Sequence, residues 1–168
     1  DAGQSLVFCT DFNRIIALDP KTGIERWVFN PEVAQERFGQ YKCRGVSLWH
    51  DDQAQKGAAC EWRVYTNTSD RRLFAVDVKT GQRCSGFGDN GEGDIPPVIE
   101  ATEPKGNIKA VQFWAPPAVI NDVIVTSPTV HSKNVLPQSY PGVVRGFDAR
   151  TGAFLWAFDV VPRNPGDP

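Results

Sequence analysis

The chain of 168 residues contains no methionine and only two histidines. It also has no run of roughly 18 apolar residues, the length that a membrane-spanning helix requires, so we expect no span. The net charge is −2, from 18 basic and 20 acidic side chains. This balance gives no electrostatic reason to expect nucleic acid or an anionic membrane as a partner. Because the chain opens at Asp1 without a signal peptide, we expect it to be processed or cut from a longer protein.

Signatures of several catalytic classes are absent from the sequence. There is no Ser-His-Asp arrangement, no phosphate-binding loop and no paired-carboxylate signature. Asp51 and Asp52 are adjacent, so in a strand their side chains would face opposite sides. His50 and His131 lie far apart along the chain, and we interpret them as solvated or packed imidazoles rather than as a metal site.

The sequence has four cysteines, Cys9, Cys43, Cys60 and Cys84, without a Cys-x-x-Cys pair or the spacing of a zinc site. An even set of this kind favours disulfides, and an oxidising compartment such as a periplasm, over four reduced buried thiols. Three pairings are open if all four cysteines are bridged. We prefer Cys60 with Cys84, because both residues fall near the same end of one predicted sheet.

What the chain does contain is a repeat. The pattern Asp-x-x-Thr-Gly occurs three times, at 19–23, 77–81 and 148–152. The first and third copies continue to Trp27 and Trp156, four residues after the glycine, whereas the second has serine there. The Asp and Thr side chains can hydrogen-bond the backbone of a tight turn, and glycine can take positive φ. Each copy follows a β-rich run, so the unit predicts a four-stranded antiparallel meander with this turn between its last two strands.

Repeated units of this kind predict an all-β fold, a segment of a β-propeller. We expect about three four-stranded antiparallel blades with tryptophan-docking motifs, the tryptophan packing between successive blades. The predicted blades span about 1–30, 42–88 and 112–160, with long loops at 31–41 and 87–111, and the first blade lacks its innermost strand. Since a propeller closes with about four to eight blades, the remaining blades or other copies are needed to close this one.

Five segments occur in order along the chain: CRGVS, RRLFAVDVKTGQRC, FGDNG, APPAVINDVIV and GVVRGFDARTGAFLWAFD. Together with the repeat A-x-D-x-x-T-G-x-x-x-W, they resemble the pyrroloquinoline quinone (PQQ)-dependent dehydrogenases. The resemblance is to the membrane-bound glucose, quinate and polyol dehydrogenase branch, and it covers nearly the whole chain. It implies that residues 1–168 form a partial quinoprotein propeller domain, taken from an eight-bladed propeller with PQQ in a central funnel.

The resemblance also implies a function for the parent protein, which would oxidise a sugar, polyol or other alcohol and pass electrons to a quinone such as ubiquinone. PQQ would be the cofactor, with calcium or magnesium polarising its quinone. The parent protein would be periplasmic, and any membrane anchor would lie in a segment outside these residues. The family's catalytic aspartate comes from later blades. We therefore assign no catalytic residue here, and we expect the isolated chain to be inactive.

Arg44 matches the arginine of the family's Arg-Gly segment, which reaches the quinone oxygens of PQQ. A guanidinium can donate to those oxygens and stabilise the negative charge that reduction builds on them. The alternative is a structural salt bridge or a surface arginine. Gln40 lies where glucose-oxidising relatives can carry a histidine near the substrate. Glutamine can hydrogen-bond but cannot titrate, which argues against glucose, and an ordinary loop glutamine is an equal alternative.

The stretch from Thr126 to Asn134 matches a family segment in which an Asp-Asn pair supplies oxygens near the metal. This sequence has no aspartate there, and the aligned positions are Ser132-Lys133 or Lys133-Asn134. Lysine is a poor partner for calcium, which takes oxygen ligands, so the departure argues against a metal site. Ser132 joins Arg44 and Gln40 as a candidate for binding the cofactor. Asn134 is the candidate metal ligand.

The tryptophans have separate interpretations. Trp27 and Trp156 are expected to be structural docking residues. Trp114 precedes the inner strand of the third blade, where it could stack near the funnel, but we interpret it as core or loop packing.

A non-catalytic scaffold is the second hypothesis for function. Related tryptophan-docked propellers serve in outer-membrane protein assembly and bind protein partners through their loops. The segment CRGVS discriminates between the two hypotheses, because a scaffold has no need for Arg44 at that place.

Overall fold

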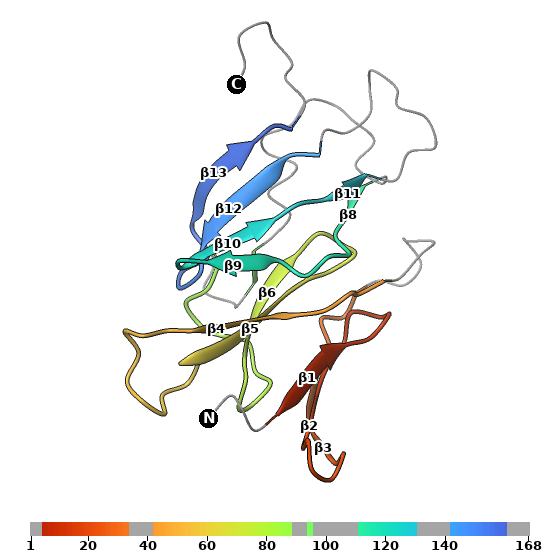
Figure 1. The fold of residues 1–168 in the computed structure, drawn as a ribbon, viewed down its shortest axis with the longest axis vertical. Coiled ribbons are helices and arrows are strands. Elements are labelled where there is room, and N and C mark those ends of the chain that lie inside the picture. Colours follow the sequence, from red (N-terminus) through yellow and green to blue (C-terminus); the bar gives the residue numbers. More distant parts are fainter. Residues whose placement is uncertain (1–4, 34–41, 89–93, 96–110, 131–141, 161–168) are drawn as a thin grey trace, which may run out of the picture.

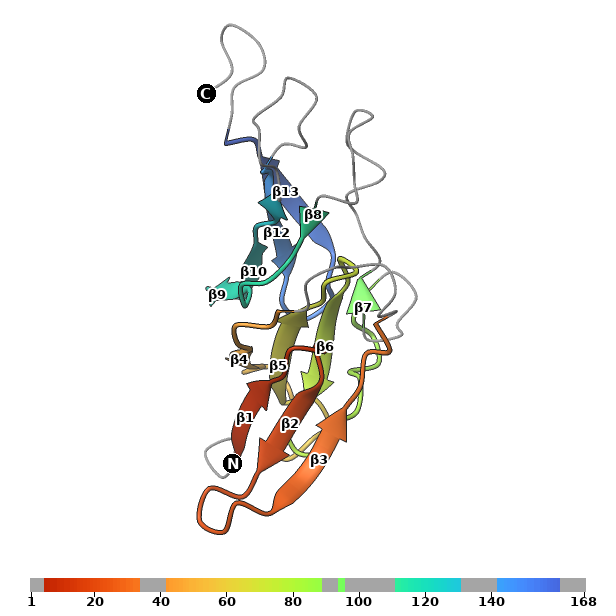
Figure 2. The ribbon, with the colours of Figure 1, turned by 90° about the vertical axis from the view of Figure 1, so that its right-hand side faces the viewer.

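The computed structural model describes residues 5–33, 42–88, 94–95, 111–130 and 142–160. These residues form strands and no helix, so none of them belongs to a helix that could cross a membrane. Figure 1 shows the strands gathered into successive sheets, with the N-terminal sheet at one end and the C-terminal sheet at the other. Figure 2 shows the same sheets after a quarter turn.

The strands pair antiparallel throughout, in three blade-like sheets and one short ribbon. The first sheet has the order β1 (Leu6–Cys9), β2 (Ile15–Leu18), β3 (Glu25–Phe29). The second has the order β4 (Ser47–His50), β5 (Trp62–Asn67), β6 (Leu73–Asp77), β7 (Asp94–Ile95). The third has the order β9 (Ala118–Ile120), β10 (Val123–Thr126), β12 (Val144–Asp148), β13 (Phe154–Phe158). The ribbon pairs β8 (Val111–Gln112) with β11 (Thr129–Val130).

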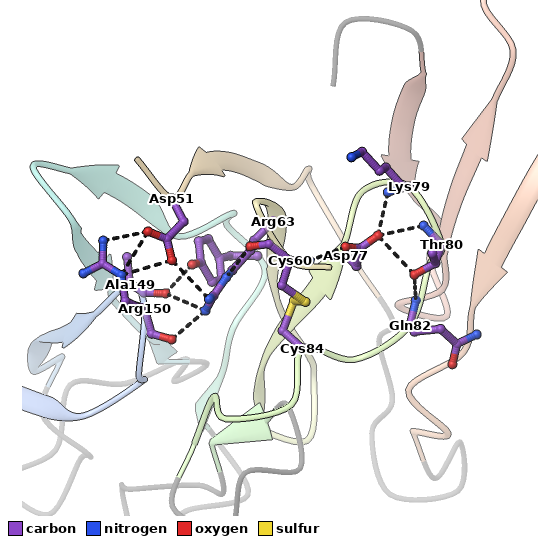
Figure 3. Close-up of a disulfide and its surroundings, with 11 residues drawn as sticks. Asp51, Cys60, Arg63, Asp77, Lys79, Thr80, Gln82, Cys84, Ala149 and Arg150 are labelled. Carbon is purple, nitrogen blue, oxygen red and sulfur yellow. Dashed lines mark hydrogen bonds and ion pairs between the residues drawn. A yellow bond between two sulfur atoms is a disulfide. The ribbon is translucent and has the colours of Figure 1, made fainter. Parts of the chain in front are cut away.

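The repeated turn has the geometry expected from its residues. Oδ1 of Asp77 accepts hydrogen bonds from the backbone amides of Lys79 and Thr80, both at 2.8 Å, and from the Thr80 hydroxyl at 3.1 Å (Figure 3). The Gly81 amide closes the turn on the Asp77 carbonyl at 2.9 Å, and Gly81 has a φ of 72°. The other two copies repeat the backbone bonds, and the third also repeats the threonine hydroxyl bond, from Thr151 to Asp148 at 2.8 Å. The all-β fold of antiparallel blades is therefore confirmed.

Among the described residues the first sheet has three strands, and the second sheet departs from the prediction. Its outer strand does not follow the turn directly. The chain makes one bridge at Arg83, and Cys84 is then held by a disulfide to Cys60. Strand β7 comes later, inside the range 87–111 for which the sequence predicted a loop. An outer strand immediately after the glycine is thus confirmed in the first and third sheets and wrong in the second, where the disulfide takes its place.

All four cysteines are paired in disulfides. The preferred pair, Cys60–Cys84, is confirmed, with the Cα atoms 5.7 Å apart. The other bridge, Cys9–Cys43, has a Cα separation of 5.9 Å and joins the end of β1 to the segment that leads into β4. One bridge therefore closes a loop within the second blade, and the other ties the first blade to the second.

Trp27 docks the first blade on the second. Its indole Nε1 donates to the carbonyl of Val78, one residue past the turn aspartate, at 3.0 Å. The six-membered face of the indole lies against Gly81, where an added Cβ would come within 2.7 Å of Cδ2 and Cε3. The expected docking role of Trp27 is confirmed. Trp156, for which the same role was expected, lies over Gly146 of its own sheet and is 40% exposed on β13, so its docking on a further blade stays a prediction.

Replacing Gly81 with alanine is expected to destabilise the protein by roughly 2 to 3 kcal/mol, because left-handed strain adds to a clash with the Trp27 indole. Gly23 is the matched control, since it has the same φ of 72° in the same turn and nothing within 4 Å of an added Cβ. Gly23→Ala should therefore cost only the strain, about 1 kcal/mol. Urea denaturation of both variants checks this, and equal losses would contradict the docking contact.

The motif's docking tryptophan is missing between the second and third blades, where Trp49 of β4 instead donates from its indole Nε1 to the Asp122 side chain at 2.8 Å. The docking position of the second motif holds Ser85, and the carbonyl of Ala149, which corresponds to that of Val78, is instead reached by other donors. The Tyr65 hydroxyl donates to it, and Arg63 Nη1 donates to it at 3.4 Å and to the Arg150 carbonyl at 2.5 Å. The equivalent backbone carbonyl therefore accepts a hydrogen bond at both junctions, from a tryptophan at the first and from a tyrosine and an arginine at the second.

A buried carboxylate organises this second junction (Figure 3). Asp51 is 4% exposed and accepts from Arg150 Nε and Nη2 at 2.8 to 3.0 Å, while Arg63 Nη2 lies 3.5 Å from Asp51 Oδ2. The hydrogen bonds from Arg150 hold the pKa of the Asp51 carboxyl below its usual value despite burial, and they raise the pKa of Arg150. The guanidinium carbons of Arg63 and Arg150 lie 5.3 and 5.5 Å from the Trp49 ring centroid, so this junction combines an ion cluster with an indole from β4.

Candidate functional site

The candidate cofactor arginine lies where the sequence predicted, immediately before the inner strand of the second blade. Arg44 belongs to the extended segment 42–46, which leads into β4, and its side chain is exposed. Its backbone amide donates to the carbonyl of Trp114 at 3.0 Å. This bond joins the segment before β4 of the second blade to the segment before β9 of the third. The candidate site therefore lies at a junction between blades.

The Trp114 indole lies beneath the Lys42 and Arg44 side chains. It is 8% exposed, and its Nε1 donates to the side-chain oxygen of Gln112 at 2.7 Å, which fixes the orientation of the ring. Lys42 Nζ lies 4.9 Å from the ring centroid, and Arg44 Cζ lies 5.7 Å from it. Both distances fall within the range of cation–π attraction. The expected packing role of Trp114 thus places it directly against the candidate arginine.

Several contacts fix the backbone around these cations. The disulfide to Cys9 holds Cys43, the residue between Lys42 and Arg44. Gly45 has a φ of 154°, and its α-carbon faces the Pro116 ring, 3.5 Å from an added Cβ. Charged side chains held from a fixed backbone lose less freedom on binding a ligand, so the geometry is suited to preorganised recognition.

A second set of polar contacts joins the neighbouring strand ends to the same region. The Asn67 side-chain amide, at the end of β5, donates to Thr126 Oγ1 at 2.9 Å and to the Ala115 carbonyl at 3.3 Å. The Ser47 hydroxyl donates to the Pro117 carbonyl. These bonds attach the segment before β9, and the end of β10, to the second blade.

The two cations carry no carboxylate partner in the described part of the chain. Neither Lys42 nor Arg44 forms an ion pair or a side-chain hydrogen bond there. The structural alternative for Arg44, a salt bridge, is therefore not found among the described residues. Two exposed positive charges held side by side are suited to binding anionic groups.

The other candidate residues, Gln40, Ser132 and Asn134, lie outside the described residues. Within the described residues, no group of three or more His, Cys, Asp or Glu side chains could hold a metal ion. The sequence reasoning missed Lys42. A signal for it was present, because residues two apart in an extended segment project to the same side, and Lys42 is two residues before Arg44.

A family model described as the β-propeller domain of PQQ-dependent glucose, ethanol and alcohol dehydrogenases matches residues 1–168. The chain belongs to this family. It is 35% identical over 161 residues to the glycerol dehydrogenase large subunit of Gluconobacter oxydans, covering 94% of this chain and 21% of that protein. It is 36% identical over 181 residues to quinate/shikimate dehydrogenase (quinone) of Acinetobacter baylyi, covering 97% of this chain and 21% of that protein.

Solved structures give the same fold. The quinohemoprotein alcohol dehydrogenase ADHIIG from Pseudomonas putida HK5 aligns with 98% of this PQQ-family chain and 20% of its own, with a TM-score of 0.72 and 25% identity. The 168-residue chain thus spans about a fifth of the length of the relatives that it matches. Its three sheets are a propeller segment, and the prediction from the repeat is confirmed.

Proposed function

We propose that this chain is part of a PQQ-dependent dehydrogenase that oxidises a sugar, polyol or other alcohol and passes the electrons to a quinone. The observation that carries the proposal is Arg44, which is exposed beside Trp114 just before the inner strand of a PQQ-family blade and has no ion pair among the described residues. The curated relatives are named as dehydrogenases. This favours the dehydrogenase over the non-catalytic scaffold.

The described residues fit part of a PQQ site. PQQ is a quinone with three carboxylates, so its site requires cationic donors, and Arg44 supplies one, held beside the buried Trp114 indole. When bound, PQQ takes up the two electrons and two protons that an alcohol loses as it becomes a carbonyl. Arg44 would donate hydrogen bonds to the quinone oxygens and stabilise the negative charge that develops on them.

Further roles in the proposal fall on residues outside the described part. Gln40 and Ser132 would contact the cofactor, and Asn134 would offer its amide oxygen to calcium or magnesium. No residue of this chain is proposed as the catalytic base, which would come from other blades. The remaining blades would also close the propeller, so the 168 residues alone should not turn over substrate.

The proposed location is the periplasm. Two disulfides among the described residues support an oxidising compartment, because such bonds persist where thiols are not kept reduced. Ubiquinone would be the electron acceptor there, and any membrane anchor would lie outside these residues.

Reconstitution tests the proposal. The complete gene product that carries this chain is purified without cofactor and titrated with PQQ in the presence of calcium. Reduction of an artificial electron acceptor is then followed with glucose, glycerol and quinate. We expect saturable PQQ binding and PQQ-dependent reduction with at least one alcohol. A gene product that binds no PQQ would refute the proposal, and rapid turnover by the isolated 168 residues would refute the assignment of the base to other blades.

A further inference from the structure

Lys42 is a cation at the candidate site to which the proposed function assigns no distinct role. Its Nζ lies 4.9 Å from the Trp114 centroid, closer than the 5.7 Å of the Arg44 guanidinium. The side chain is exposed, and it has no ion pair or hydrogen bond among the described residues. A second positive charge beside Arg44 that is not neutralised by any described residue requires an explanation.

We infer that Lys42 is a specificity-determining residue that binds a carboxylate of the substrate, so that the enzyme favours hydroxy acids over uncharged polyols. The inference rests on the proposed function, which places Arg44 at the quinone oxygens. The carbon that is oxidised must approach those oxygens. Because Lys42 and Arg44 lie over one indole ring, the ammonium group is close to the place where that carbon reacts. A carboxylate a few bonds away from the reacting hydroxyl can therefore meet it.

The chemistry of lysine suits this role. Its ammonium is a compact point charge with three donors on a flexible stem, so it can follow a carboxylate whose position differs between substrates. Arg44 is a rigid fork, better suited to fixed oxygens such as those of a bound quinone. The two cations thus divide the site into a fixed part for the cofactor and an adaptable part for the substrate.

The backbone below Lys42 makes the contact effective. Cys43 is bridged to Cys9, and the Arg44 amide is bonded to the Trp114 carbonyl at 3.0 Å. The lysine therefore starts from a fixed α-carbon, and its stem lies over an indole that is itself held by Gln112. Only the freedom of the side chain is lost when a carboxylate binds. Since the ammonium is exposed, water screens the attraction, and we expect an effect of about tenfold rather than a thousandfold.

The test compares Lys42→Gln with the unmodified complete gene product, loaded with PQQ, on two matched probes. Quinate carries a carboxylate, and its methyl ester has the same ring hydroxyls without the charge. We expect Lys42→Gln to raise the KM for quinate about tenfold and to leave the KM for the ester and the PQQ titration unchanged. Lys42→Arg should restore most of the quinate affinity. Lys21→Gln, which removes an exposed lysine of the β2–β3 turn, is the control and should change nothing.

A readout independent of turnover accompanies the kinetics. Calorimetry on the PQQ-loaded protein measures the dissociation constant of quinate without an electron acceptor, and the same tenfold loss is expected in Lys42→Gln. Equal losses for the acid and its ester would overturn the inference, as would a parallel loss of PQQ affinity, which would assign Lys42 to the cofactor. Unmodified protein that binds PQQ but not quinate would also overturn it. Failure to bind PQQ at all would instead refute the proposed function.

Discussion

Replacing Arg44 with alanine in the complete gene product is expected to weaken PQQ binding by about 10- to 100-fold, the usual range for losing hydrogen bonds from a charged donor. The guanidinium is proposed to donate to the quinone oxygens. Its removal leaves those oxygens without a partner and removes a positive charge where reduction adds negative charge. Electron transfer to an artificial acceptor should therefore slow even when PQQ saturates the protein. PQQ titration by fluorescence quenching and steady-state kinetics measure the two effects.

Two further substitutions serve as controls for the Arg44→Ala variant. Arg44→Lys keeps the charge but not the fork, so it should recover part of the affinity and little of the geometry. Arg26→Ala removes a surface arginine whose partner is Asp19 on the first blade, at 2.5 Å, and it should leave PQQ binding unchanged. Unaltered PQQ titration and activity in Arg44→Ala would remove the observation on which the proposed function depends and would favour a scaffold.

Replacing Asp51 with alanine is expected to destabilise the protein by about 3 kcal/mol, because it leaves the buried Arg63 and the partly buried Arg150 without their counter-charge. The side chains of Asp51 and Arg63 are 6% and 9% exposed, and Arg150 donates to the carboxylate from two nitrogens. The loss should appear as a lower urea midpoint. Asp52→Ala is the matched control: Asp52 is the next residue, its side chain is 75% exposed, and its contact with Arg150 at 3.6 Å should be worth less than about 1 kcal/mol.

The Asp51 contribution should also depend on pH. Hydrogen bonds from Arg150 lower the pKa of Asp51 in the folded protein. A carboxyl whose pKa is lowered by folding stabilises the protein above its unfolded pKa, about 3.9, and loses that contribution as the pH falls through the folded value. The stability difference between unmodified protein and Asp51→Asn should therefore be constant from about pH 5 to 8 and shrink below about pH 4. A difference that persists at pH 2 would mean that packing, rather than charge, is lost.

The sequence by itself determined the antiparallel blades and their repeated turns, except for the outer strand of the second blade. Asp-x-x-Thr-Gly is a local pattern, and its turn depends on hydrogen bonds between residues two or three apart, such as those of Asp77 with Lys79 and Thr80. The even set of cysteines and the ordered family segments were also visible along the chain. The position of Arg44 at an inner-strand mouth followed from the blade boundaries, although its cofactor role remains a proposal.

Only the tertiary structure decided how the blades meet and what surrounds Arg44. Asp51 and Arg150 are 99 residues apart, and no local pattern pairs them; the serine at position 85 showed that a docking tryptophan was missing but not what replaced it. Lys42 and Trp114 are likewise distant in sequence and meet because the Arg44 amide binds the Trp114 carbonyl. Turn chemistry acts between neighbouring residues and can be read from the sequence. Pairing across blades depends on where folding brings separate strand ends together, so the second junction and the cation pair over the indole emerged only in three dimensions.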